Sequence, residues 1–135
     1  MDDFDFAAPD LEEFAALAEA AFAALPAPFR EGCDGVLVRV AEFADEEVLR
    51  DMGIADPFEL TGLYSGVDLT RKSSLDVAAG RDEVWLYRRP ILDEWAERAD
   101  VGIAELVAHV MVHEIGHHFG LTDEQIEAIE ARAGD

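Results

Sequence analysis

The stretch from Val101 to Phe119 constrains the fold of this chain more than any other. Its apolar residues have helical spacing and lie on nearly every side of the predicted helix: Val101, Ile103, Ala104, Leu106, Val107, Val110, Met111, Val112 and Ile115. Asp100 is placed to cap its first turn, and Gly120 is placed to end it. A helix that is apolar all the way round must be covered by other elements. The sequence therefore predicts a long helix buried in the middle of the domain.

The far end of this helix carries polar residues that burial alone disfavours. They form the pattern His-Glu-x-x-His, from His113 to His117. Histidines four residues apart project from one face of a helix, so both imidazoles can reach a single Zn²⁺ ion. Glu114 then stands beside them as the general base for a metal-activated water. The alternative is a pair of hydrogen-bonded core histidines.

A catalytic zinc site needs a third protein ligand and an open position for water. Asp123 is the first candidate, because Gly120 can adopt the left-handed conformation and turn the chain back towards the metal. The alternative role of Asp123 is in the first turn of the last helix, where an acid is favourable. Glu127 and Glu130 are the next candidates for the third ligand.

Three neighbours of the motif have predicted roles of their own. His118 lies about 100° around the helix from His117, so it is predicted to support the site from behind its ligands or to lie on the surface. His109, one turn earlier, is predicted to be a hydrogen-bonded core histidine. Gly116 is predicted to let a strand or a substrate pack closely against the helix, with a merely tolerated small residue as the alternative.

The rest of the chain mixes strand-like and helical patterns. Runs rich in β-formers predict strands at residues 36–41, 60–65 and 84–88. Capping signals and apolar stripes predict helices at residues 10–25, 45–49, 90–99 and 123–133. Residues 1–9 are predicted to be an acidic tail and residues 10–135 a single domain. Such a mixture of strands and helices indicates an α+β fold.

Charge and composition narrow the possible partners. The net charge is −21, from 31 acidic and 10 basic residues among 135. Such a field repels phosphate groups and argues against nucleic acids and anionic membranes as partners. The acidic N-terminus does not resemble a signal peptide, and no apolar run approaches the ~20 residues of a spanning helix. The single cysteine, Cys33, excludes an intrachain disulfide, and a cytoplasmic location is expected.

Three stretches resemble one family, the minimal zincin-like metallopeptidases of short bacterial proteins. They are HEIGHHFGLTDEQI at residues 113–126, LTGLYSGVDLTRKS at 60–73 and VWLYRRPIL at 84–92. The resemblance implies a compact zincin-like fold, with a small mixed sheet packed on a buried active-site helix and further helices flanking it. It also implies that His113 and His117 bind zinc, that Glu114 is the catalytic base and that Asp123 is the third ligand.

The string His-Glu-x-x-His-x-x-Gly-x-x-Asp is also similar to that of snapalysin-type metzincins. This chain departs from them, because only 12 residues follow Asp123 and none is methionine, so their Met-turn is absent. The tyrosine often found near that turn is missing as well. Candidates for stabilising a transition state in its place are Tyr64, Tyr87, Arg88 and His118.

The function expected from these observations is zinc-dependent hydrolysis of a peptide or protein substrate. Nitrogen and oxygen ligands also suit other divalent ions. An extended substrate is expected along an exposed sheet edge, with residues 84–88 as the nearby strand. Two alternatives stay open: a metal hydrolase of a non-peptide substrate such as RNA, against which Glu114 and the charge argue, and a metal-binding interaction module without catalysis.

Overall fold

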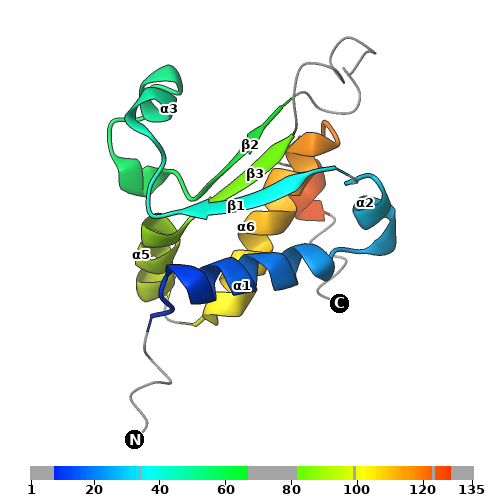
Figure 1. The fold of residues 1–135 in the computed structure, drawn as a ribbon, viewed down its shortest axis with the longest axis horizontal. Coiled ribbons are helices and arrows are strands. Elements are labelled where there is room, and N and C mark those ends of the chain that lie inside the picture. The colour runs from blue at the N-terminus through cyan, green and yellow to red at the C-terminus, as the bar shows by residue number, and fades with distance from the viewer. Residues whose placement is uncertain (1–7, 34, 67–81, 99, 123, 129–135) are drawn as a thin grey trace, which may run out of the picture.

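The structure is a computed structural model that describes residues 8–33, 35–66, 82–98, 100–122 and 124–128. Its elements, in chain order, are α1 (Leu11–Ala23), α2 (Ala27–Glu31), β1 (Leu37–Ala41), α3 (Glu46–Asp51), the 3₁₀ turn η2 (Pro57–Glu59), β2 (Gly62–Ser65), β3 (Glu83–Tyr87), α5 (Arg88–Arg98) and α6 (Ile103–His118). Residues 124–128 are also helical. The predicted α+β class and the three predicted strands are confirmed (Figure 1).

The three strands form one mixed sheet in the order β1-β3-β2. β3 is parallel to β1 and antiparallel to β2, with Val38 opposite Val84 and Tyr64 opposite Val84 on its other side. β3 is therefore the central strand, with both of its edges hydrogen-bonded. The expectation that residues 84–88 lie beside a peptide at an exposed edge is wrong for this reason, and among the described strands β2 and β1 form the two edges.

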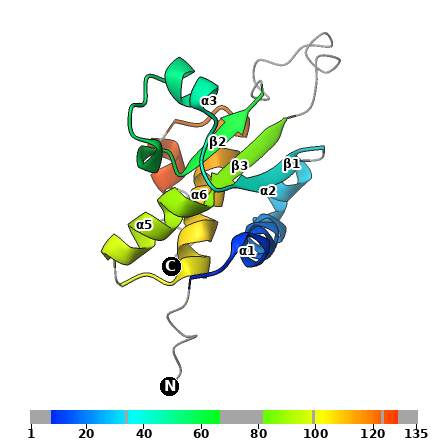
Figure 2. The same cartoon turned by 60° about the vertical axis from the view of Figure 1, so that its left-hand side comes forward.

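The alternation of side chains along β3 divides the interior into two parts. Val84 and Leu86 are fully buried against α1 and α6, whereas Trp85 and Tyr87 stack on the opposite face, with ring centroids 6.3 Å apart. α3 covers that second face with Ala44, which precedes it, and Leu49. Figures 1 and 2 show α1 and α6 on one side of the sheet and α3 on the other.

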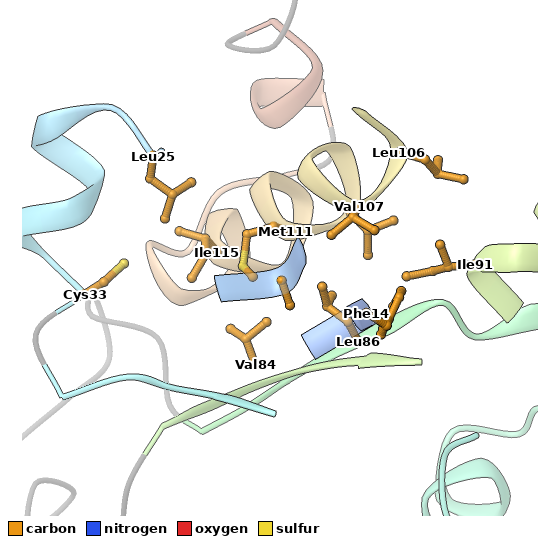
Figure 3. Packing of buried hydrophobic residues seen from close by; sticks show 12 residues of the cluster. Phe14, Leu25, Cys33, Val84, Leu86, Ile91, Leu106, Val107, Met111 and Ile115 are labelled. Carbon is orange, nitrogen blue, oxygen red and sulfur yellow. The ribbon is translucent and has the colours of Figure 1, made fainter. Parts of the chain in front are cut away.

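The main core lies between α6 and the sheet. Figure 3 shows Val107, Met111 and Ile115 of α6 among side chains from α1 and β3, including Phe14 and Leu86. Each of these five side chains is at most 1% exposed. Burying a side chain of this size stabilises the fold by about 1.5–3 kcal/mol.

α6 is central, as predicted, but it is not buried on every side. Ala104 and His109 are exposed and Val112 is only partly buried. The prediction of His109 as a core histidine is therefore wrong. The exposed face continues towards His113, so the open side of α6 is the side that carries the motif.

The helix ends follow local capping chemistry, with one correction. Asp10 and Glu13 form the predicted capping box of α1, with bonds of 2.8 and 2.9 Å. α6 begins two residues later than predicted, because its N-cap is Gly102 rather than Asp100. Glu105, three residues into the turn, accepts a hydrogen bond from the Gly102 backbone N–H at 3.4 Å, as the acidic half of a capping box does.

Candidate metal centre

The last two turns of α6 bring His113, Glu114 and His117 together. One ligand atom from each residue lies within 4.8 Å of the other two, and all three side chains are half-buried. The two imidazole rings have their centroids 5.1 Å apart and stand nearly perpendicular, at 79°. Within the described part of the chain, this group of side chains is the one whose donor atoms could hold a metal ion.

β2 packs unusually closely on the helix beside this group. A Cβ atom on Gly62 would lie 2.9 Å from Cγ1 of Val110 and 3.0 Å from Cγ of Glu114, and 3.2 Å from the backbone oxygen of Trp85. The stem of Glu114 therefore rests on the backbone of β2, with no room for a side chain between them. A glycine inside a predicted strand, as at Gly62, is the sequence signal for such a close approach.

The end of α6 reverses the chain through Gly120, as predicted. Gly120 has φ +73°, and its N–H donates to the oxygen of His117 at 3.0 Å. The N–H of Leu121 donates to the oxygen of Gly116, also at 3.0 Å, which completes a Schellman motif. Glycine is favoured here because other residues are strained at positive φ.

The segment after the reversal packs back onto α6 at Gly116. A Cβ atom on Gly116 would lie 2.5 Å from two side-chain carbons of Ile126, which is 1% exposed. Thr122 and Gln125 form the predicted capping box of this segment, with bonds of 2.8 and 3.2 Å. The close packing expected at Gly116 is confirmed, and its partner is this helical segment.

The predicted third ligand is not among the described residues. Asp123 and Glu130 lie outside them, so their roles as ligands stay predictions. Glu127 is exposed on the helical segment 124–128. Residues 1–7 of the predicted acidic tail and residues 129–133 of the predicted last helix also lie outside the described residues.

His118 is buried on the side of α6 that faces β2, where it is 2% exposed. Its Nε2 lies 2.8 Å from the carbonyl oxygen of Gly32, so this nitrogen carries the proton and donates. In the neutral ring Nδ1 then accepts from the Tyr64 hydroxyl at 3.1 Å, and Oδ2 of Asp82 lies 3.6 Å away. His118 and Tyr64 thus join α6, β2 and the end of α2.

Tyr87 and Arg88 lie in different surroundings, although they are adjacent. Tyr87 is 3% exposed, and burial, followed by the nearby charges of Asp45 and Glu114, raises its pKa to about 12. Its phenol therefore stays protonated at neutral pH, within reach of the electrostatic field of Glu114. Arg88 binds the backbone oxygen of Pro9 at 2.8 Å and Glu42 at 2.7 Å, towards the β1 side of the sheet.

Cys33 does not offer a second reactive centre. It is 3% exposed, and burial raises the pKa of its thiol to about 11, against a smaller opposing effect of Arg30. The thiol is therefore protonated at neutral pH and a poor nucleophile.

A pocket of about 190 Å³ adjoins the His-Glu-x-x-His group. It is lined by Thr61, Glu94, His109, Val110, His113 and Glu114. Glu94 comes from α5 and Thr61 precedes β2, so three separate parts of the chain enclose it. Glu94 and Thr61 had no sequence signal, because nothing in their local pattern indicates that they meet His113.

No helix in the described part of the chain has both the length and the apolar character that crossing a bilayer requires.

Two comparisons with known proteins test which family the chain belongs to. A search of curated proteins found no match. The sequence profile of one family, described as zincin-like metallopeptidase, matches residues 33–133, which are 101 of the 135 residues. That range includes the three strands, α6 and the converging His113, Glu114 and His117, and the chain therefore belongs to the zincin-like metallopeptidase family.

Proposed function

We propose that this protein is a zinc-dependent hydrolase of peptide bonds. The observation that carries the proposal is the convergence of His113, Glu114 and His117 within 4.8 Å, in a chain of the zincin-like metallopeptidase family. Two imidazoles and carboxylate oxygens form a donor set that suits Zn²⁺, although other divalent ions accept the same donors. His113 and His117 would hold the ion, with Asp123 as the proposed third ligand.

A zinc ion bound there would polarise the scissile carbonyl and make the attacking water more acidic. Glu114 is the proposed general base, which removes a proton from that water and returns it to the leaving amine. The close packing of Glu114 on Gly62 limits the positions that its carboxylate can take. Such restraint supports proton transfer, which requires the base to stay within hydrogen-bond reach of the water.

The proposed substrate is an extended peptide that runs along β2. β2 is an edge strand in the described sheet and lies directly against Glu114 through Gly62. An extended chain can add to such an edge by main-chain hydrogen bonds, which bind peptides with little regard to their side chains. Tyr64, on the same strand, would then act through its bond to His118, by holding the strand against α6.

The replacement Glu114→Gln tests the mechanism. We expect the variant to retain metal and to lose at least about 100-fold in peptide cleavage, because the amide cannot take the proton. Glu97→Gln, an exposed position on α5, is the matched control and should keep full activity. Unchanged cleavage by Glu114→Gln would overturn the mechanism.

Metal content tests the site separately from the chemistry. Elemental analysis should find near-stoichiometric metal in the wild type and in His109→Ala, and its loss in His117→Ala. Metal retention without cleavage of any peptide would instead favour an interaction module. Absence of metal from the wild type after loading with Zn²⁺ would remove the basis for the enzyme.

A further inference from the structure

The 190 Å³ pocket beside Glu114 has the size of a site for one long side chain. It is smaller than the pockets of about 300–1,000 Å³ that hold whole small molecules. It shares two of its lining residues, His113 and Glu114, with the proposed reaction centre. A side chain in this pocket would therefore belong to a substrate residue close to the bond that is cut.

The acidic side chains that line the pocket are not matched by lysine or arginine. Two of its six lining residues are glutamates, Glu94 from α5 and Glu114 from α6, and none is lysine or arginine. Figures 1 and 2 show α5 beside α6, and Ile91 and Trp95 of α5 pack into the core that α6 forms. Glu94 thus lines the pocket from a helix that is packed against α6.

Glu94 already binds a guanidinium group. Arg98, one turn along α5, places Nε 3.0 Å from Oε2 of Glu94, with side chains 47% and 32% exposed. An incoming cation would compete with this exposed ion pair, and exposed pairs of this kind are weak. Val110 supplies an apolar wall against which the methylene stem of a lysine or arginine can pack.

We propose that this pocket receives a lysine or arginine side chain of the peptide substrate, and that Glu94 determines that specificity. The inference rests on the proposed peptidase function and adds a substrate class to it. The net charge of −21 acts in the same direction, since a strongly acidic protein attracts cationic peptides and repels acidic ones. Glu114 also lines the pocket, but its proposed role is proton transfer, which leaves Glu94 as the residue for recognition.

Cleavage of three matched peptides tests the proposal. The peptides differ at one position next to the scissile bond, which holds arginine, the neutral isostere citrulline, or glutamate. We expect the wild type to cut the arginine peptide about three- to tenfold more efficiently than the citrulline peptide, in kcat/KM, and the glutamate peptide least. Glu94→Gln should bring the ratio of arginine to citrulline close to one.

Two further variants separate recognition from general charge effects. Glu97→Gln removes the same charge from an exposed position of α5 outside the pocket, and it should leave the ratio unchanged. Arg98→Gln removes the competing cation, and it should raise the ratio. A ratio that is the same in Glu94→Gln and the wild type, or that falls equally in Glu97→Gln, would overturn the role of Glu94.

A binding measurement that needs no catalysis tests the pocket separately from the proposed peptidase function. The protein as purified can be titrated with N-acetyl-arginine amide and N-acetyl-citrulline amide, with NMR shifts of Thr61 and His109 as the readout. We expect those shifts to be larger for the arginine compound in both the wild type and Glu114→Gln, and equal for the two compounds in Glu94→Gln. Equal shifts in the wild type would overturn the subsite, whereas loss of all cleavage with this preference intact would overturn only the peptidase.

Discussion

Individual residues of this site owe their properties to neighbours that are distant in sequence. His118 is two residues from an exposed turn, yet it is buried through bonds to Gly32 and Tyr64. Gly62 lies in a strand of ordinary composition, but its missing side chain lets β2 rest on Glu114. Tyr87 lies at the end of the central strand, where Asp45 and Glu114 both oppose a negative charge on its phenol.

Alkaline pH should destabilise the protein through Tyr87. In the unfolded chain the phenol ionises near its ordinary pKa of 10.0, whereas in the native state its pKa is about 12. Between these values the unfolded state binds fewer protons than the native state, so the free energy of unfolding falls as pH rises. Below about pH 10 both states are protonated and this effect is absent.

Urea unfolding across this pH range measures the effect. The free energy of unfolding should fall less steeply in Tyr87→Phe than in the wild type. Cys33, whose pKa is about 11 against an ordinary 9.0, contributes a loss that begins at lower pH, and Cys33→Ala separates the two. Equal pH slopes in the wild type and Tyr87→Phe would contradict this assignment.

The helical segment 124–128 packs on the end of α6 that carries the His-Glu-x-x-His motif. The Schellman motif at Gly120 turns the chain, and Ile126 then fills the space that Gly116 leaves. The capping box of Thr122 and Gln125 starts the new helical turn. Local turn signals and one tight tertiary contact therefore act together on this element.

The contact between Gly116 and Ile126 can be measured with a double-mutant cycle. In the wild type, Gly116→Ala should lower the free energy of unfolding by about 1–2 kcal/mol, because the new methyl group clashes with Ile126. In an Ile126→Ala background the clash is removed, and the same change should raise stability by up to about 1 kcal/mol through helix propensity. Urea unfolding of the four metal-free proteins gives the coupling energy. The same effect of Gly116→Ala in both backgrounds would show that the two residues do not press on each other.

The α+β arrangement as a whole combines two buried clusters with a strongly acidic surface. Ion pairs in the described part of the chain include Arg39 with Glu83, Arg88 with Glu42, and Arg98 with Glu94. The chain has 10 basic residues for 31 acidic ones, so repulsion between carboxylates dominates its electrostatic field. Self-repulsion of this kind opposes the compact state and is screened by salt.

Added sodium chloride should therefore stabilise this protein. We expect the free energy of unfolding to rise by on the order of 1 kcal/mol as the Debye length shortens from about 30 Å to well below 10 Å. Urea unfolding at increasing salt concentration, with the metal removed, checks the sign. A decrease would mean that attraction within ion pairs outweighs the repulsion.

Features that depend on neighbours along the chain could be predicted from the order of the amino acids. These are the three strands, the long helix, the capping boxes at Asp10 and Thr122, the reversal at Gly120, and the placing of His113, Glu114 and His117 on one helix. Each follows from side-chain spacing or from backbone preferences within a few residues. Both can be read directly from the sequence.

Which of these elements contact one another became clear from the three-dimensional fold. It placed β3 between β1 and β2, so that the strand expected beside the substrate became the centre of the sheet. It left His109 exposed, moved the N-cap of α6 to Gly102, and brought Glu94 of α5 to the pocket beside Glu114. Strand order and contacts between helices depend on the packing of apolar faces from distant segments, and periodicity along the chain indicates which face is apolar but not which partner covers it.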